Sequence, residues 1–221
     1  MTGVYQIKKK QNFFSGLSVN VSLIIANVVA FVVFTILISS NANFINFIAI
    51  KPSNIVHGQY LWTIITSMFM HGGIFHLFAN MLTLFFMGSL IEKILGRKRY
   101  LWFYIAAGIF ASLLFVLLSF VFPVDYNQFA VGASGAIFGL IGLLMVLTPN
   151  LPVMIFFIPI PIKLKYAAPG ILIVLWLISV AGSVPIGNTA HLGGFIFGLL
   201  YGWYLRNKYK RKTQYIRKYF S

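Results

Sequence analysis

Residues 131–140 of the sequence, VGASGAIFGL, place a single serine, Ser134, among small residues at the head of an apolar run. A hydroxyl group in an apolar helix is most often structural, so Ser134 by itself identifies no chemistry. Gly135, Gly139 and Gly142 follow at spacings that put them on one face of a helix. Because such small residues let membrane helices approach closely, we expect this helix to pack tightly against a partner.

The composition of the chain around this stretch is that of a membrane protein. Of its 221 residues, 60% are hydrophobic and only 9% are charged, whereas about a quarter of the residues of a soluble domain are charged. Segments near the 20-residue length that crosses a bilayer lie at 19–39, 76–95, 100–122, 131–148, 167–184 and 189–205. The predicted fold is an all-α polytopic membrane protein with six transmembrane helices, which occupy residues 19–205.

The charges indicate how this membrane domain is oriented. With six spans, all 17 Lys and Arg residues except Lys51 fall on one side of the membrane. The positive-inside rule then predicts that the N-terminal segment 1–18 and the basic tail 206–221 are both cytoplasmic. This distribution explains the net charge of +15 better than nucleic-acid binding does, and we expect no nucleic-acid partner. The tail is suited to contact anionic lipid.

Two apolar segments are not expected to span the membrane. The loop 40–75 contains Tyr60 and Trp62, residue types that favour the membrane interface, so we expect this outer loop to be partly embedded. The stretch FFIPIPIKLK at 156–165 carries Pro159 and Pro161, which a regular helix does not accept. It is predicted to form a turn or a short extended segment on the cytoplasmic side.

The fourth and sixth spans carry a serine and a histidine at similar depth. The fourth span has 17 residues from Val131 to Leu147, about 25 Å of helix, which places Ser134 below the outer surface. The sixth span opens with AHLGGFIFGLLYG at 190–202, where one helical face carries His191, Gly194, Gly198 and Gly202. Both helices run inward, so packing along their glycines would bring Ser134 and His191 together as nucleophile and base.

The second span adds polar groups at the same outer level. In MHGGIFHLFANM at 70–81, His76 and Asn80 share a helix face, and His71 lies in the preceding loop. Polar side chains within spans are costly and mark functional sites more often than packing. Imidazole and amide donors close to a buried serine suggest an oxyanion hole for a carbonyl under attack.

The motifs GASGAIFG, HGGIFHLFAN and AHLGGFIFGLLYG together resemble those of the rhomboid family of intramembrane serine proteases, over about residues 55–205. The resemblance implies a rhomboid-like bundle with a catalytic dyad of Ser134 and His191. It also implies that the oxyanion is held by Asn80, His76 and the Ser134 backbone N–H, and it gives supporting roles to His71 and Gly132.

Further residues have expected structural roles. The resemblance implies that Glu92 is an anchor near the inner end of the second span, and it places Trp62 in the outer loop, followed by Thr63 where many relatives carry arginine. Neither Glu92 nor Asp125 lies where it could orient His191. We therefore expect Phe138, one helical turn below Ser134, to hold the imidazole by stacking.

The expected activity is that of a serine endopeptidase that cuts transmembrane helices of membrane proteins near the outer face, in a prokaryotic cell membrane, with the site open to the exterior. No cofactor or metal is expected, because there is no cysteine and no H-E-x-x-H motif. An aspartyl protease would need two carboxylates at one site, and Glu92 and Asp125 lie at different depths. A transporter and a catalytically inactive rhomboid-like binder of membrane helices are the remaining alternatives.

Overall fold

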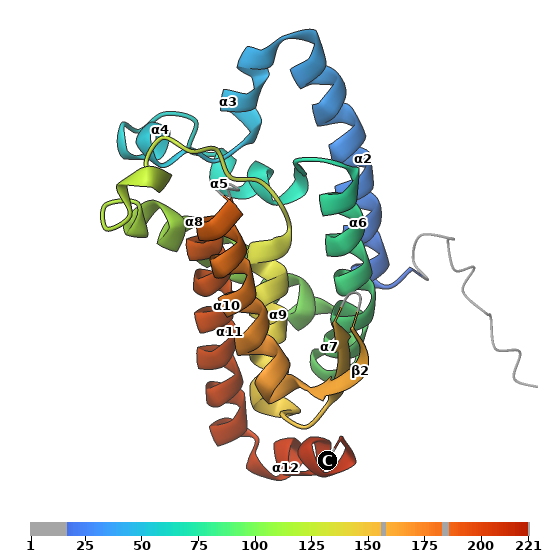
Figure 1. The fold of residues 1–221 in the computed structure, drawn as a ribbon. Helices are drawn as coiled ribbons and strands as arrows, with labels where there is room; N and C mark the ends of the chain where they lie inside the picture. The colour runs from blue at the N-terminus through green and yellow to red at the C-terminus, as the bar shows by residue number, and fades with distance from the viewer. Residues whose placement is uncertain (1–16, 156–157, 183–185, 221) are drawn as a thin grey trace, which may run out of the picture.

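The computed structural model describes residues 17–155, 158–182 and 186–220, and these are mostly helical (Figure 1). The predicted N-terminal segment lies almost wholly outside the described residues. In chain order the elements are α2 (Val19–Ser40), η1 (Ala42–Phe44), α3 (Ile45–Ile48), α4 (Pro52–Val56), α5 (Thr63–Thr66), η2 (Ser67–Phe69), α6 (Ile74–Thr83), the π-helical turn η3 (Leu84–Gly88), α7 (Ser89–Leu95), α8 (Arg97–Leu118), η4 (Pro123–Asp125), α9 (Ser134–Leu147), β1 (Pro152–Ile155), β2 (Ile158–Lys163), α10 (Leu164–Gly182), α11 (Asn188–Lys208) and α12 (Lys210–Tyr219).

Each of the six predicted spans contains a helix, but their lengths differ. In the described part of the chain, four helical stretches are long and apolar enough to cross a membrane, namely Val19–Ser40, Ile74–Leu95, Arg97–Leu118 and Leu164–Gly182. Helix α9 has 14 residues, about 21 Å of helix, and is shorter than a bilayer core. The count of six membrane spans therefore stays a prediction.

Two expectations about these elements were wrong. The third predicted span ran to residue 122, whereas α8 ends at Leu118 and a turn follows, because Pro123 disfavours helical backbone in the residue before it. The fold is also not purely helical, since β1 and β2 pair as an antiparallel hairpin. Pro159 and Pro161 fall within β2, where they prevent a helix, so the predicted extended segment is one strand of this hairpin.

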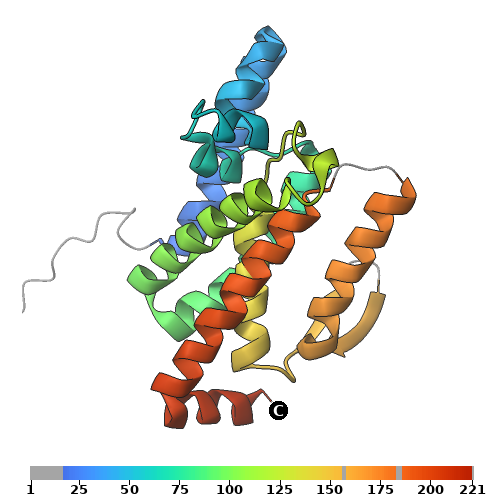
Figure 2. The ribbon, with the colours of Figure 1, turned by 90° about the vertical axis from the view of Figure 1, so that its left-hand side faces the viewer.

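Helix α9 lies at the centre of the bundle between α8 and α11 (Figure 2). The approach of α9 and α11 is so close that a Cβ on Gly194 would collide with the carbonyl oxygen of Gly135. A Cβ on Gly198 would likewise meet the carbonyl of Gly139. The glycines of α11 therefore lie against the backbone of α9, and only glycine permits this contact, whereas the Cβ positions of Gly135 and Gly139 face α8.

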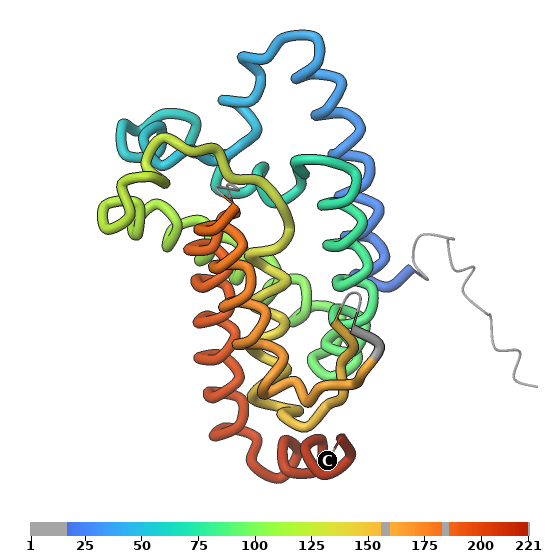
Figure 3. Tube along the Cα trace, in the orientation of Figure 1, coloured from blue at the N-terminus to red at the C-terminus, as the bar shows by residue number. Residues whose placement is uncertain are grey.

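The segment from η1 to η2 crosses the end of the bundle at which α9 and α11 begin (Figures 1 and 3). Trp62 in this segment is 53% exposed, and its indole N–H donates to the Phe47 carbonyl at 2.9 Å. Thr63 is fully buried, and its hydroxyl donates to the Tyr60 carbonyl at 2.7 Å. This bond gives the loop an internal polar contact. How deeply the loop sits in a membrane stays a prediction.

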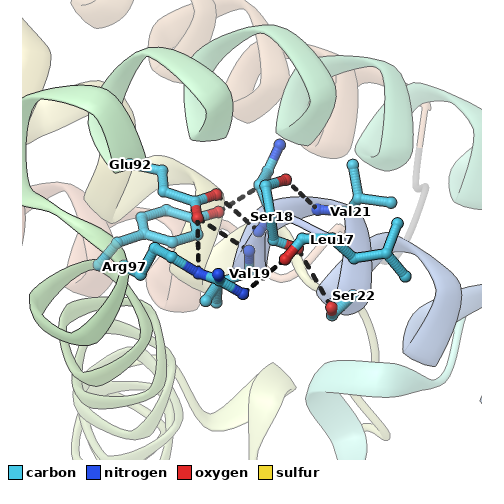
Figure 4. A network of polar contacts seen from close by, with 9 residues as sticks. Leu17, Ser18, Val19, Val21, Ser22, Glu92 and Arg97 are labelled. Carbon is cyan, nitrogen blue, oxygen red and sulfur yellow. Dashed lines mark hydrogen bonds and ion pairs between the residues drawn. The ribbon is translucent and has the colours of Figure 1, made fainter. Parts of the chain in front are cut away.

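Glu92 on α7 joins the beginning of α2 to the rest of the bundle (Figure 4). Its carboxylate accepts the backbone N–H groups of Val19 and Asn20, each at 2.8 Å. These are among the first N–H groups of α2, which have no partner within that helix, and a carboxylate is favoured at a helix N-terminus. Arg97 lies 3.9 Å from the same carboxylate but is largely exposed, so this ion pair contributes little.

The side chain of Asn20 connects the start of α2 to the π-helical turn η3. Its amide donates to the Leu84 carbonyl at 2.9 Å and to the Ser89 hydroxyl at 3.1 Å. The Tyr100 hydroxyl donates to its oxygen at 2.5 Å. Because a π-turn interrupts the regular helical bonding, a side chain that satisfies its carbonyl stabilises the irregularity. The buried Asn20 side chain thus links α2, η3 and α8.

We expect Glu92→Gln to lower the free energy of unfolding by about 1–3 kcal/mol, because one buried N–H of α2 loses its charged acceptor. The measurement is detergent-induced unfolding of the purified protein, followed by circular dichroism. The matched control is Lys93→Gln, which removes a charge from the exposed neighbouring position. Equal midpoints for the two variants would contradict an anchoring role for Glu92.

Helix α12 contains most of the basic tail. Figures 1 and 2 show it lying across the end of the bundle opposite to the η1–η2 segment, at a steep angle to α11. Thr213 is buried against the bundle, and its hydroxyl donates to the backbone of the preceding turn. Tyr215 and Tyr219 are more than 70% exposed. The tail is therefore an ordered helix that presents basic and aromatic side chains at one end of the molecule.

Candidate active site

Ser134 is the first residue of α9, and His191 lies in the first turn of α11. The close packing of these parallel helices brings the His191 Nε2 atom within 2.7 Å of the Ser134 Oγ atom. His191 is 7% exposed, so the contact is shielded from bulk solvent. This separation is that of a hydrogen bond between a hydroxyl and an imidazole, the arrangement that activates a serine nucleophile.

The imidazole of His191 is held by an aromatic ring. The Phe138 ring stacks on it with centroids 4.6 Å apart and an interplanar angle of 27°. The two acidic residues make contacts elsewhere, since Asp125 accepts the Thr189 hydroxyl at 3.1 Å and Glu92 binds the start of α2. Within the described residues the His191 Nδ1 atom has no hydrogen-bond partner. The His191 ring is therefore contacted by the Phe138 ring, while both carboxylates are engaged with other groups.

Gly132 and His76 form one wall of the site. Gly132 adopts a φ of +126°, which side chains with a Cβ rarely adopt. A Cβ at this position would lie 2.9 Å from His76 Cε1 and 3.6 Å from Ser134 Oγ. The Gly132 backbone N–H donates to the Ser67 carbonyl at 2.8 Å, so it is already used. Gly132 therefore makes room for the His76 ring beside the serine and does not itself offer a free donor.

Asn80 and His71 supply buried polar atoms whose hydrogen bonds are unsatisfied. In the described part of the chain, the Asn80 amide nitrogen and both ring nitrogens of His71 lack partners. The His71 ring lies 5.2 Å from that of His76, edge to face. Burial, together with the charge of His76, lowers the pKa of His71 to about 4, so its ring is neutral near pH 7. Since unpaired buried polar atoms are costly, this cluster is suited to receive a polar ligand or water.

Some residues that shape the site were missed in the sequence. Cβ atoms on Gly135 and Gly139 would lie 2.7 Å and 2.6 Å from the methyl groups of Ala111 and Ala107 on α8. Helix α8 therefore presents small residues to the centre of the bundle, as α9 and α11 do. The cluster of alanine and glycine at 106–111 could have predicted this packing. It contains no polar residue that would mark it as part of a site.

The three histidines of this region, His71, His76 and His191, are of a residue type that can bind metal ions. Over the residues that the structure describes, no group of three or more histidine, aspartate and glutamate side chains is placed to hold a metal ion. The Nε2 atom of His191 is engaged with Ser134. The site's contacts therefore favour proton transfer to and from the serine.

Helices long and apolar enough to cross a bilayer indicate an integral membrane protein, and in its described part a serine hydroxyl contacts a buried histidine. Comparison with known proteins assigns the family. A family model described as the Rhomboid domain matches residues 58–208, and the chain belongs to the rhomboid family. The family membership predicted from the three motifs is thereby confirmed.

Similar proteins come from several kinds of organism. The chain is 37% identical to RHOMBOID-like protein 1 of Arabidopsis thaliana, over 70% of this chain and 37% of the relative. It is 31% identical to Rhomboid protein 1, mitochondrial, of Saccharomyces cerevisiae, over 69% and 44% of the two chains. It is 35% identical to Rhomboid protease GluP of Bacillus subtilis, over 67% and 26%. The chain thus covers less than half the length of these relatives, and their sources do not single out a prokaryotic membrane.

Proposed function

We propose that the protein is an intramembrane serine endopeptidase that uses Ser134 and His191 as a dyad. The observation that carries this proposal is the 2.7 Å contact between the partly buried Ser134 Oγ and the Nε2 atom of the buried His191. Its relative in Bacillus subtilis is named a rhomboid protease, which agrees with proteolysis by this family. The substrates are membrane proteins whose transmembrane helices enter the site.

In the proposed reaction, His191 Nε2 accepts the hydroxyl proton as Ser134 Oγ attacks a peptide carbonyl. The new Oγ–C bond gives a tetrahedral intermediate, and its collapse breaks the C–N bond while His191 returns the proton to the leaving amine. Water then attacks the acyl-enzyme with His191 again as base, and the serine is regenerated. Stacking on Phe138 keeps the imidazole in position through both steps.

The oxyanion of this intermediate needs donors that are in place before the reaction. We assign this role to the Asn80 amide, His76 and the Ser134 backbone N–H. Ser134 opens α9, so its N–H is among those that have no partner within the helix. The Asn80 amide nitrogen is buried and has no hydrogen-bond partner among the residues that the structure describes. His71 supports the His76 ring from behind, through their edge-to-face contact.

The orientation of the protein in the membrane and its contact with lipid are assigned from the distribution of its Lys and Arg residues. All basic residues except Lys51 fall on one side of a six-span arrangement, so both termini are assigned to the cytoplasm and the site to the outer half of the membrane. The basic face of α12 is assigned to anionic lipid headgroups. Cleavage then takes place near the outer face, where water has access.

A catalytically inactive rhomboid-like binder is the second candidate function. Such a protein would hold membrane helices without activating a serine. The contact between Ser134 and His191 favours the protease, since a binder has no need for a base on its serine. Reactivity of the serine distinguishes the two functions.

We expect a fluorophosphonate probe to form one covalent adduct with the purified protein, at Ser134, because His191 activates only this hydroxyl. The measurement is intact mass followed by peptide mapping. Ser134→Ala should give no adduct. Ser119→Ala is the control, since Ser119 is a buried serine whose hydroxyl donates to the Val116 carbonyl at the end of its own helix, and it should label like the original chain. A folded protein with no adduct would favour the binder.

A further inference from the structure

The β1–β2 hairpin is apolar except for Lys163, the last residue of β2. The stretch LPVMIFFIPIPI at 151–162 contains no charged or polar side chain. One side of the hairpin packs into the bundle, where Val153 is 8% exposed and belongs to the main core. Met154 and Ile160 are 73% and 66% exposed. In water these side chains would form part of an unfavourable apolar surface.

The hairpin lies at the level of the membrane-crossing helices. Two backbone hydrogen bonds close the base of the hairpin. The Leu164 N–H donates to the Leu151 carbonyl at 2.9 Å, and the Lys165 N–H donates to the Pro149 carbonyl at 3.0 Å. From this base the strands fold back beside the first half of α10, as both Figures 1 and 2 show. They do not extend past the end of the bundle, where α12 lies. Since α10 is one of the candidate spans, the hairpin occupies the same depth as its inner half.

A sheet edge is normally unsuited to lipid, because its outer N–H groups find no acceptor there. Three prolines reduce this cost in the hairpin: Pro152 in the four-residue β1, and Pro159 and Pro161 in the six-residue β2. Proline has no N–H, so these positions present no donor to desolvate. The same prolines oppose pairing with a strand of another copy, which would need those donors.

We infer that the hairpin is a re-entrant element, inserted into the bilayer leaflet at the end of α9 and the start of α10, and that its exposed face contacts lipid acyl chains. Met154 and Ile160 lie in the hydrocarbon region. Lys163 and Lys165 follow directly and mark the headgroup boundary, where the Lys165 ammonium lies over the Tyr166 ring. The inference concerns membrane insertion and does not depend on the proposed protease activity.

The chain contains no cysteine, so single-cysteine variants report one position without background. The test uses Met154→Cys and Ile160→Cys in the full-length protein in lipid nanodiscs, with Lys163→Cys as the matched control at the base of the hairpin. One readout is the rate of reaction with a charged, membrane-impermeant maleimide. The other is the quenching of a fluorophore attached at the same position by lipids brominated in their acyl chains.

We expect the two hairpin positions to react about tenfold more slowly than Lys163→Cys, because apolar side chains of this size favour hydrocarbon over water. Brominated lipid should quench the fluorophores at these two positions, and it should quench the fluorophore at the Lys163→Cys control much less. Fast reaction at both positions would overturn the inference and place the hairpin in water. Slow reaction without quenching would also overturn it, because protein would then cover the hairpin, and cross-linking would identify a second copy.

Discussion

Ser134→Ala is expected to abolish cleavage of a model transmembrane substrate while the protein stays folded. The serine supplies the atom that bonds to the carbonyl, and within the described residues its hydroxyl contacts His191 across two closely packed helices. His191→Ala should reach nearly the same floor, because an unactivated serine hydroxyl is a weak nucleophile at neutral pH. Removal of either member of such a pair typically costs on the order of 10⁴-fold or more in turnover.

The measurement is steady-state cleavage by purified protein in one detergent, with circular dichroism and thermal unfolding to check folding. Ser119→Ala serves again as the buried-serine control and should retain the original rate. The double variant with both replacements should be no slower than either single variant, because the two residues act as a unit. Turnover near the original rate by either folded single variant would overturn the dyad.

Asn80→Ala is expected to lower turnover by about 10²–10³-fold, which corresponds to roughly 3–4 kcal/mol in the transition state. The amide nitrogen is buried without a partner in the described structure, so it is available when charge develops on the substrate oxygen. Asn80 transfers no proton. The rate should therefore stay above the floor set by Ser134→Ala, and KM should change little, because this donor acts mainly in the transition state.

The control on the same helix is Thr83→Ala, since the Thr83 hydroxyl already donates to the Ala79 carbonyl at 2.8 Å. That variant should cleave at the original rate. Labelling of Asn80→Ala by fluorophosphonate should be slower but still complete, because His191 can still activate the serine. If Asn80→Ala cleaves and labels as fast as Thr83→Ala, Asn80 is a packing residue and the oxyanion assignment fails.

The membrane character and the order of helices could be predicted from the sequence, because both are local properties. Long apolar runs specify helices that bury their own backbone bonds, and Pro159 and Pro161 specify an extended segment. Glycines at spacings of three and four specify a close helix contact. The sequence therefore predicted the contact between Ser134 and His191 that the structure contains, whereas the chemical roles of these two residues, of His76 and of Asn80 stay proposals.

The precise contacts could not be read from the sequence. The alanines of α8 that complete the glycine packing carry no distinctive signal, and the 14-residue length of α9 depends on where neighbouring turns begin. The hairpin pairing of β1 and β2 was also missed. Strand pairing joins residues by register across a turn, and an apolar run with prolines is equally compatible with an unpaired loop.

What the sequence by itself determined is which segments are apolar enough to be membrane spans and which polar residues they contain. The stacking of Phe138 on His191, expected from the sequence, is confirmed. Only the tertiary structure decided that Gly132 clears space for His76 and that Asp125 accepts the Thr189 hydroxyl. The physical reason is the range of each interaction. Hydrophobic length and helical period act within a segment, whereas a 2.7 Å contact between side chains 57 positions apart depends on how whole helices pack.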